Sequence, residues 1–119
     1  MEQPKSPDNK SLDLVAERFR ILGDALRLQL LHRLADGEMS VGTLAEASGA
    51  SQANVSKHLQ ILLRAGLVER RKDGLQAFYT IADPSIFDLC DLVCGRLSKQ
   101  FQEDLSAIGT LRHPGRPTP

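Results

Sequence analysis

The strongest constraint on the fold is a pair of short helical segments that are separated by about three residues. The first segment is expected to begin at Ser40 and to stop at Ser48-Gly49. The second is expected to be capped by Ser51 and to end before Gly66. Serine is a favoured helix N-cap, and glycine is favoured just beyond a helix C-terminus. Two helices this short and this close together predict a helix-turn-helix unit.

The apolar period changes from that of a helix to that of a strand directly after this unit. Leu67–Lys72 and Leu75–Ile81 are expected to form two short strands. Asp73-Gly74 between them predicts a two-residue type I′ turn, which needs a positive φ at both central residues. Because one hairpin alone is only marginally stable, we expect it to pack against the helices.

Helical periodicity also extends on both sides of this central region. Ser11 is expected to cap a first helix and Asp24 a second, and Asp83-Pro84 is expected to begin a long last helix that reaches Ile108. Apolar residues of the last helix are spaced three and four apart, which suits a partner helix. These apolar positions are Ile86, Cys90, Val93, Cys94, Leu97, Phe101, Leu105 and Ile108.

The order of these elements predicts a mainly α fold with a β-hairpin wing, that is, a winged helix-turn-helix. We expect it to form a homodimer through its first and last helices. At 119 residues the chain is expected to hold one such domain, over residues 11–109. Residues 1–10 are expected to form a flexible N-terminal segment, and residues 110–119 a disordered, proline-rich tail.

Several classes of protein are disfavoured by features that the sequence lacks. No run of about 18 apolar residues is present, so a transmembrane helix is not expected. No secretory signal is visible, so we expect a cytoplasmic protein without a membrane partner. No Ser-His-Asp or Cys-His set, Gly-rich phosphate loop or pair of catalytic carboxylates stands out, so we do not expect an enzyme.

Positive charge is concentrated in the central region, although the whole chain has a net charge of zero. Residues 51–80 carry five basic and two acidic side chains. The first turns of the second helix of a helix-turn-helix enter the major groove of DNA, where side-chain amides can pair with adenine. A wing contacts the phosphate backbone or the minor groove. The expected DNA-binding residues are Ser51, Gln52, Asn54, Ser56, Lys57, Arg70, Arg71, Lys72 and Gln76.

Simpler interpretations of these residues remain open. The polar residues of the helix also fit an ordinary solvated face. The three consecutive cations Arg70–Lys72 also fit a basic edge strand that is protected against aggregation. Since alternate residues of a strand point to opposite faces, some of the three could serve packing or solubility instead of DNA binding.

Three stretches of the sequence, Leu22–Leu34, Ser51–Val68 and Arg70–Gly74, together resemble the ArsR/SmtB (arsenic-repressor) family of bacterial regulators. The most specific stretch reads Ser-Gln-x-x-Val-Ser-x-His-Leu-x-x-Leu-x-x-Ala-Gly-Leu-Val. The resemblance covers roughly residues 12–105. It implies a homodimeric winged-helix repressor that binds a palindromic operator on double-stranded DNA and releases it when an inducer binds. His58 matches the family's histidine in this stretch, and we expect it to serve packing and hydrogen bonding.

Two ligand sets that members of this family use are absent from the chain. The Cys-x-Cys pair of the third helix would fall within Met39–Leu44, which contains no thiol. The Asp and His set of the last helix would include Asp83, but its two downstream histidines are missing.

The remaining candidate is the pair Cys90 and Cys94, whose spacing of four places both thiols on one face of the last helix. Two thiolates there could chelate a soft ion, so As(III), Sb(III), Cd(II) and Zn(II) are the candidate inducers, with no cofactor required. Two alternatives stay open. The cysteines could respond to oxidation or sulfur species, or they could be packing residues of a DNA-binding regulator that has no ligand.

Overall fold

The structure is a computed structural model in which residues 8–108 are described, with side chains as far as residue 102. The chain divides into two compact units, and the boundary lies between Asp83 and Pro84. Most of the expected N-terminal segment and the whole of the expected tail at 110–119 lie outside the described residues. Residues 9 and 10, which were expected within the flexible segment, belong to the first helix.

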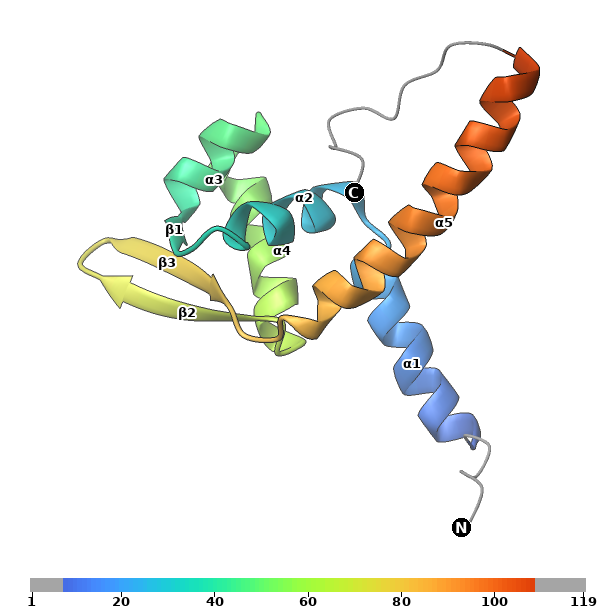
Figure 1. The fold of residues 1–119 in the computed structure, drawn as a ribbon. Coiled ribbons are helices and arrows are strands. Elements are labelled where there is room, and N and C mark those ends of the chain that lie inside the picture. The colour runs from blue at the N-terminus through green and yellow to red at the C-terminus, as the bar shows by residue number, and fades with distance from the viewer. Residues whose placement is uncertain (1–7, 109–119) are drawn as a thin grey trace. The chain divides into compact units, whose positions relative to one another are not determined.

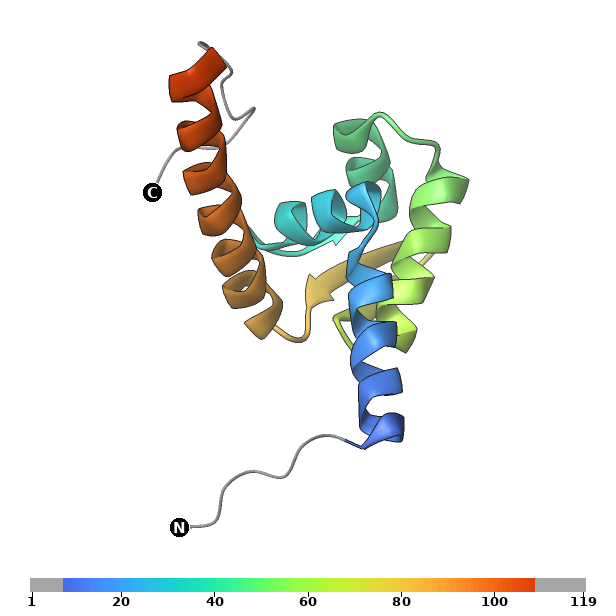
Figure 2. The same cartoon turned by 90° about the vertical axis from the view of Figure 1, so that its right-hand side faces the viewer.

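The first unit combines helices with a small antiparallel sheet, and the second unit is one long helix (Figures 1 and 2). In the sheet, β3 lies between β1 and β2 and pairs with both of them. The turn end of the β2–β3 hairpin projects beyond α3 and α4 (Figure 1). The elements in chain order are α1 (Asn9–Leu22), α2 (Ala25–Leu34), β1 (Met39–Ser40), α3 (Val41–Ser48), α4 (Gln52–Arg64), β2 (Val68–Asp73), β3 (Gln76–Ile81) and α5 (Ser85–Ile108).

The core of the first unit is formed by the apolar stripes of α2, α3 and α4 together with Tyr79 of the sheet. Each fully buried leucine or valine contributes about 1.5–3 kcal/mol relative to an exposed one. These contacts fix how the helices of the unit pack on one another. The fully buried side chains are Tyr79, Leu30, Leu31, Leu34, Leu44, Leu59, Leu62, Leu67, Val55 and Val68.

Three of the four N-caps in the first unit follow the expected pattern. Asp24, Ser40 and Ser51 each accept a hydrogen bond from the backbone N–H three residues ahead, at 3.0 to 3.1 Å. The expectation that Ser11 caps α1 is wrong. Asp8 accepts the Ser11 backbone N–H at 2.7 Å, and this bond lowers the pKa of Asp8. The helix therefore begins three residues earlier than Ser11 would allow.

The sheet differs from the expected hairpin in two respects. It has a third strand, β1, whose two residues are too few to show a period of two in the sequence. In addition, Asp73 pairs with Gln76, so the central turn residues are Gly74 and Leu75. Gly74 has a φ of 63°, and no other residue type in the described range has a positive φ. A type I′ turn is therefore excluded, because it needs a positive φ at both central residues.

The second unit consists of α5, which has 24 residues and ends at Ile108 as expected. It begins at Ser85, two residues after the aspartate that was expected to cap it. Among the described residues, no helix is both long and apolar enough to cross a membrane.

Candidate nucleic-acid interface

The helix-turn-helix is formed by α3 and α4, which are joined by three residues. Gly49 ends α3 with a φ of 74°, a left-handed conformation that glycine adopts without strain. Two residues later Ser51 caps α4, so the sequence itself fixes where the second helix begins. The expected helix-turn-helix is therefore present with the expected boundaries.

One face of α4 is buried, and this sets which of its residues can meet a partner. Val55, Leu59 and Leu62 have no exposed surface and anchor the helix in the core. The polar residues of the first turns lie off this buried stripe. Of the expected DNA-binding residues in this segment, Ser51, Gln52 and Lys57 are exposed, whereas Asn54 and Ser56 are half-buried.

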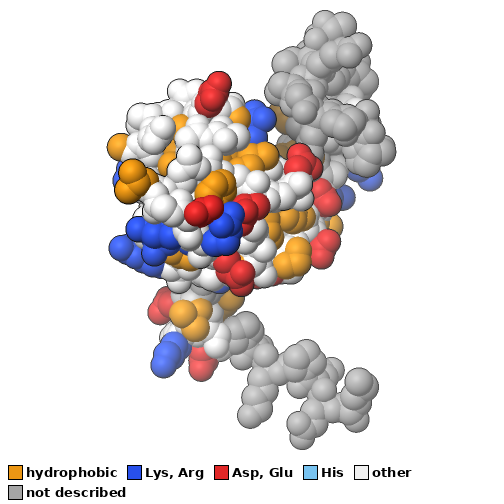
Figure 3. Space-filling model, turned by 90° about the vertical axis from the view of Figure 1, so that its left-hand side faces the viewer, with side chains coloured by type: hydrophobic (Ala, Val, Ile, Leu, Met, Phe, Trp, Pro, Cys, Tyr) orange, Lys and Arg blue, Asp and Glu red, His pale blue; other side chains and the backbone are white. Residues whose placement is uncertain are grey.

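A cleft connects the start of α4 with the wing. Gln52 of α4 and Gln76 of β3 both line it, together with Leu75 and Ala77 of the wing and the start of α3. Two of the expected DNA-binding residues, from separate elements, thus border the same hollow. Lys and Arg side chains gather on the face that the end of the hairpin presents, with acidic side chains beside them (Figure 3).

The three consecutive cations of β2 are divided between the two faces of the hairpin. Arg70 pairs with Tyr79, so Arg70 and Lys72 lie on the face on which Tyr79 is buried. Arg71 pairs with Phe78 and lies on the other face. All three cations are exposed, but they cannot all approach one ligand from the same side.

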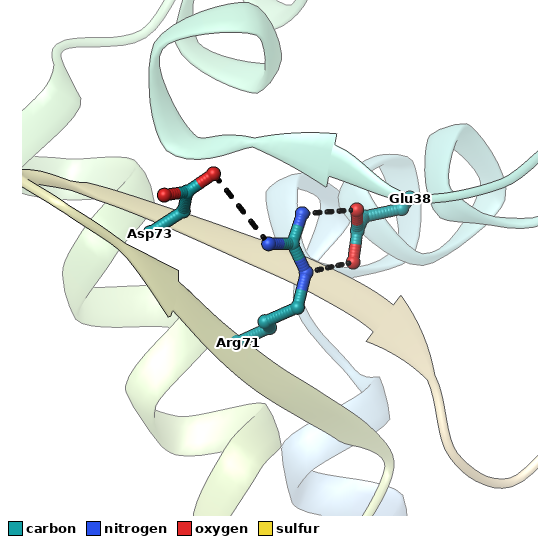
Figure 4. Close-up of polar contacts among 3 residues, drawn as sticks. All are labelled: Glu38, Arg71 and Asp73. Atoms are coloured by element: carbon teal, nitrogen blue, oxygen red, sulfur yellow. Dashed lines mark hydrogen bonds and ion pairs between the residues drawn. The ribbon is translucent and has the colours of Figure 1, made fainter.

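Arg71 has close partners inside the protein. Its Nη2 and Nε donate to the two carboxylate oxygens of Glu38, at 2.7 and 3.1 Å, and its Nη1 lies 3.8 Å from the carboxylate of Asp73 (Figure 4). Its guanidinium carbon also lies 4.7 Å from the centre of the Phe78 ring. Pairing with Glu38 raises the pKa of Arg71 and lowers the pKa of Glu38.

His58 is a buried polar residue of α4 and joins this helix to α2. It is 8% exposed, and Arg27 Nη1 donates to its Nδ1 at 3.1 Å. Since a guanidinium can only donate, Nδ1 is the acceptor and a neutral ring carries its proton on Nε2. Burial lowers the pKa of His58, and the positive charges of Arg27 and Lys57 lower it further, against the opposing effect of Asp24. The expectation of a packing and hydrogen-bonding role is confirmed.

Two arginines tie α1 to the helix-turn-helix. Arg27 donates from Nε to the carbonyl of Ile21 at 2.6 Å, so the arginine that holds His58 also holds the end of α1. Arg18 donates to the carbonyl of Ala65, the C-cap of α4, at 3.0 Å. Neither arginine was expected from the sequence, and neither was Glu38. No local pattern marks them, because each partner is brought close only by the fold.

Both α1 and α5 carry exposed apolar residues that their own units do not cover. Leu12, Leu14, Val15 and Phe19 of α1 are 47–67% exposed. Leu92, Val93, Leu97 and Phe101 of α5 are 43–67% exposed. Single exposed apolar residues are ordinary, but four along one helix form an apolar surface that the helix's own unit leaves open.

Cys90 and Cys94 lie four residues apart on α5, half-buried, and neither is disulfide-bonded. The spacing places both sulfur atoms on one helical face, as expected. Within the described residues, no group of three or more His, Cys, Asp or Glu side chains could hold a metal ion. The pair could therefore supply two ligands to an ion, and any further ligands would have to come from elsewhere.

Comparison with known proteins supports this architecture at the level of sequence. Residues 22–71 match a family model described as a helix-turn-helix domain. The chain is 46% identical over 83 residues to the HTH-type transcriptional regulator KmtR of Mycobacterium tuberculosis, covering 70% of this chain and 63% of that protein. It is 40% identical over 77 residues to a probable mercury resistance operon repressor of Streptomyces lividans, covering 65% and 62%. The alignments thus span less than two thirds of the length of these two relatives.

Comparison with solved structures extends the likeness over almost the whole of a related domain. The homodimeric winged helix-turn-helix DNA-binding domain of Mb0332 from Mycobacterium bovis, a possible ArsR-family regulator, superposes with a TM-score of 0.62. It is 34% identical, and the match covers 93% of this chain and 99% of that one. These relatives are transcriptional regulators, not enzymes. The chain belongs to the ArsR/SmtB family of winged helix-turn-helix transcriptional regulators.

Proposed function

We propose that the protein is an inducible repressor that binds a palindromic operator as a homodimer. The observation that carries this proposal is the arrangement of α4, whose buried stripe holds it in the core while Gln52 and Lys57 remain exposed at its start. A helix held in this way can enter the major groove with its first turns. The amides of Gln52 and Asn54 suit adenine edges, and Ser51, Ser56 and Lys57 suit bases or phosphates.

The wing would supply sequence-independent affinity. Arg70 and Lys72 are exposed on one face of the hairpin, and Gln76 borders the cleft that reaches Gln52. Cations on the hairpin that borders this cleft are suited to the phosphates that flank the major groove. Each phosphate that they neutralise would contribute about 0.9 to the slope of log affinity against log salt.

The exposed apolar residues of α1 and α5 are the surfaces that we assign to the dimer. Two copies would place two α4 helices on half-sites about one turn of DNA apart, which explains the need for a palindrome. Leu105, another expected interface residue, lies beyond the residues whose side chains are described. A Phe101→Asp variant should sediment as a monomer at micromolar concentration, whereas the neighbouring Gln100→Asp should remain a dimer. A dimeric Phe101→Asp variant would contradict the assignment.

DNA binding itself is tested by selecting duplexes from a random library and from the region upstream of the coding sequence. The wild-type protein should enrich a symmetric site and protect both of its halves from cleavage. Gln52→Ala should relax this preference at one base pair of each half-site, and Gln29→Ala on α2, also an exposed glutamine, should keep it in full. If no duplex is enriched, or if Gln52→Ala selects the same site, the proposed function or the proposed helix is wrong.

We assign the inducer to Cys90 and Cys94. Their half-buried thiols share one face of α5, and thiolates are the ligands that soft ions prefer. One chain offers two such ligands, so As(III), Sb(III), Cd(II) or Zn(II) would be held most firmly where the α5 helices of two copies meet. A mercury-resistance repressor among the relatives adds Hg(II) to the ions worth testing. An ion bound there would favour one arrangement of the dimer and so alter the spacing of the two α4 helices.

The inducer assignment is tested by titrating each ion into the reduced protein on its operator. The expected result is release by at least one soft ion, with no effect of Mg²⁺. To weaken binding about a hundredfold, the ion must favour the DNA-free form by about 2.7 kcal/mol. Cys90→Ser, Cys94→Ser and the double variant should bind DNA normally and fail to respond. An unchanged response would make the cysteines packing residues, and release by a mild oxidant alone would favour a redox regulator.

A further inference from the structure

The guanidinium of Arg71 is held on three sides by side chains of the first unit. Glu38 receives two hydrogen bonds from it, and Asp73 lies 3.8 Å from it (Figure 4). The centre of the Phe78 ring lies 4.7 Å from its central carbon. A two-bond pairing of guanidinium and carboxylate fixes both distance and orientation, which a single ion pair does not. Among the wing cations Arg70, Arg71 and Lys72, Arg71 is therefore the one whose charge is balanced by carboxylates and whose side chain is held in one position.

The pairing with Glu38 spans the sheet from β2 to the segment that precedes β1, with β3 between them. Arg71 belongs to β2, and the residue opposite it, Phe78, pairs on its other side with Ser40. Ser40 is the N-cap of α3, and Glu38 lies two residues before it. The contact therefore runs from the wing, across the central strand, to the segment that enters the helix-turn-helix.

The position of Arg71 also disfavours a contact with phosphate. Arg70 and Lys72 share the other face of the hairpin, so a duplex that meets those two cations does not meet Arg71 from the same side. A phosphate that approached the remaining donors of Arg71 would in addition come close to the carboxylates of Glu38 and Asp73, and both carboxylates repel a phosphate. Contact of Arg71 with a phosphate would thus be opposed by the two carboxylates beside it, and Arg70 and Lys72 lie on the opposite face of the hairpin.

We propose that Arg71 is a positioning residue for DNA binding, which through Glu38 sets the wing relative to α3 and α4 so that Arg70 and Lys72 can reach the backbone. This inference rests on the proposed DNA-binding function. It assigns a role to Glu38, an acidic residue that electrostatics alone would make unfavourable for DNA binding.

Glu38→Gln provides the decisive test, because the two roles of Arg71 predict effects of opposite sign. If Arg71 contacts phosphate, removing the acidic charge frees it, and affinity for the operator rises. If Arg71 positions the wing, the same change weakens the two-bond pairing, and affinity falls by about fivefold. Affinity is measured by fluorescence anisotropy on the selected operator, and circular dichroism checks that the variant is folded. A Glu38→Gln variant that binds as well as or better than wild type overturns the inference.

Variants of Arg71 give a second and independent readout. Arg71→Ala and Arg71→Lys should weaken binding to a similar extent, because lysine cannot reproduce the two-bond pairing. Both should also lower the salt slope to a similar extent, because both release the wing that carries Arg70 and Lys72, although lysine keeps the positive charge. The matched control is Arg70→Ala, which should lower the salt slope by about one. A slope lowered by Arg71→Ala, together with normal binding by Arg71→Lys, would make Arg71 an ordinary phosphate contact.

The double variant Glu38→Gln/Arg71→Ala completes the cycle. Its affinity should match that of Arg71→Ala alone, because both changes remove one interaction. Additive losses would show that the two residues act separately and would overturn the inference. Gln52→Ala distinguishes the proposed DNA-binding role of α4 from the proposed positioning role of Arg71. If the wild type selects an operator and Gln52→Ala relaxes the preference at one base pair, the helix assignment stands whatever the wing variants show.

Discussion

Helix α4 and the outer part of the wing are held in place by different forces. α4 is anchored by side chains without exposed surface, including Leu59 at its middle. The turn end of the wing carries only exposed or half-buried side chains, and Arg71 ties it to the chain that leads into α3. Burial fixes a helix through shape and the hydrophobic effect, at any salt concentration. A surface ion pair is weakened by salt, so the position of the wing is the adjustable part of the interface.

The largest effect is expected where the packing of α4 is broken. Leu59→Ala should lower the free energy of unfolding by about 2–5 kcal/mol, because it removes a fully buried side chain and leaves a cavity. Urea unfolding followed by circular dichroism measures the loss. Leu75→Ala, at the fully exposed tip of the wing, is the matched control and should change stability by less than about 0.5 kcal/mol. Equal losses for both variants would contradict the contrast between helix and wing.

The next largest effect distinguishes recognition of the DNA sequence by α4 from binding of the DNA backbone by the wing. Gln52→Ala should cost about 1–3 kcal/mol of operator binding and relax the preference at one base pair, with an unchanged salt slope. Lys72→Ala should weaken binding to all duplexes alike and lower the salt slope by about one. Anisotropy titrations on the operator and on a scrambled duplex, at several salt concentrations, provide both quantities. If the two variants behaved alike, helix and wing would not have distinct roles.

The parts of the fold that the sequence predicted are those that depend on neighbouring residues. The caps Asp24, Ser40 and Ser51 were predicted because each bonds a backbone N–H only three residues away. Asp8 was missed because two possible caps, Asp8 and Ser11, lie within one turn and the sequence does not choose between them. Strand β1 was missed because it exists only through its pairing with Tyr79 and Phe78.

In the candidate site, too, features set by neighbouring residues were predicted, and contacts that only the fold brings together were not. The exposed start of α4 was predicted, since the buried stripe of this helix can be recognised from its spacing. The different role of Arg71 could not be predicted, because Glu38 is 33 residues away and its approach depends on the order of strands in the sheet. Similarly, Arg27 and His58 are 31 residues apart and meet only after α2 and α4 have packed. Strand alternation already predicted that the three adjacent cations would not all share one face, and the distant carboxylate of Glu38 is what distinguishes Arg71.

A smaller effect on stability is expected from pH, and it arises from His58 of α4. The pKa of His58 is lower in the folded protein than the ordinary value of 6.5. Between the folded pKa and 6.5 the unfolded chain binds more protons than the folded chain. The contribution of neutral His58 to the free energy of unfolding is therefore fully present above pH 6.5, and it is lost as the pH falls toward the folded pKa. Urea unfolding at pH 7.5 and 5.5 should show this decrease. His58→Gln, which can still accept from Arg27, should flatten it, and an unchanged pH dependence would show that other groups cause it.

The smallest effect on stability is expected from the contact between Arg71 and Glu38, which we propose sets the position of the wing. Arg71 lowers the pKa of Glu38 below its ordinary value of 4.5, so the pair is fully charged at neutral pH and is lost only as the pH falls through the folded pKa. Both partners are solvent-exposed, and such pairs add little to global stability. Glu38→Gln should therefore leave the melting temperature at pH 7 almost unchanged, in low and in high salt, while the affinity for DNA falls. Melting followed by circular dichroism and titration of the same sample test both statements together. A large drop in melting temperature would mean that Glu38 stabilises the fold as a whole, and the wing would then be held as firmly as α4.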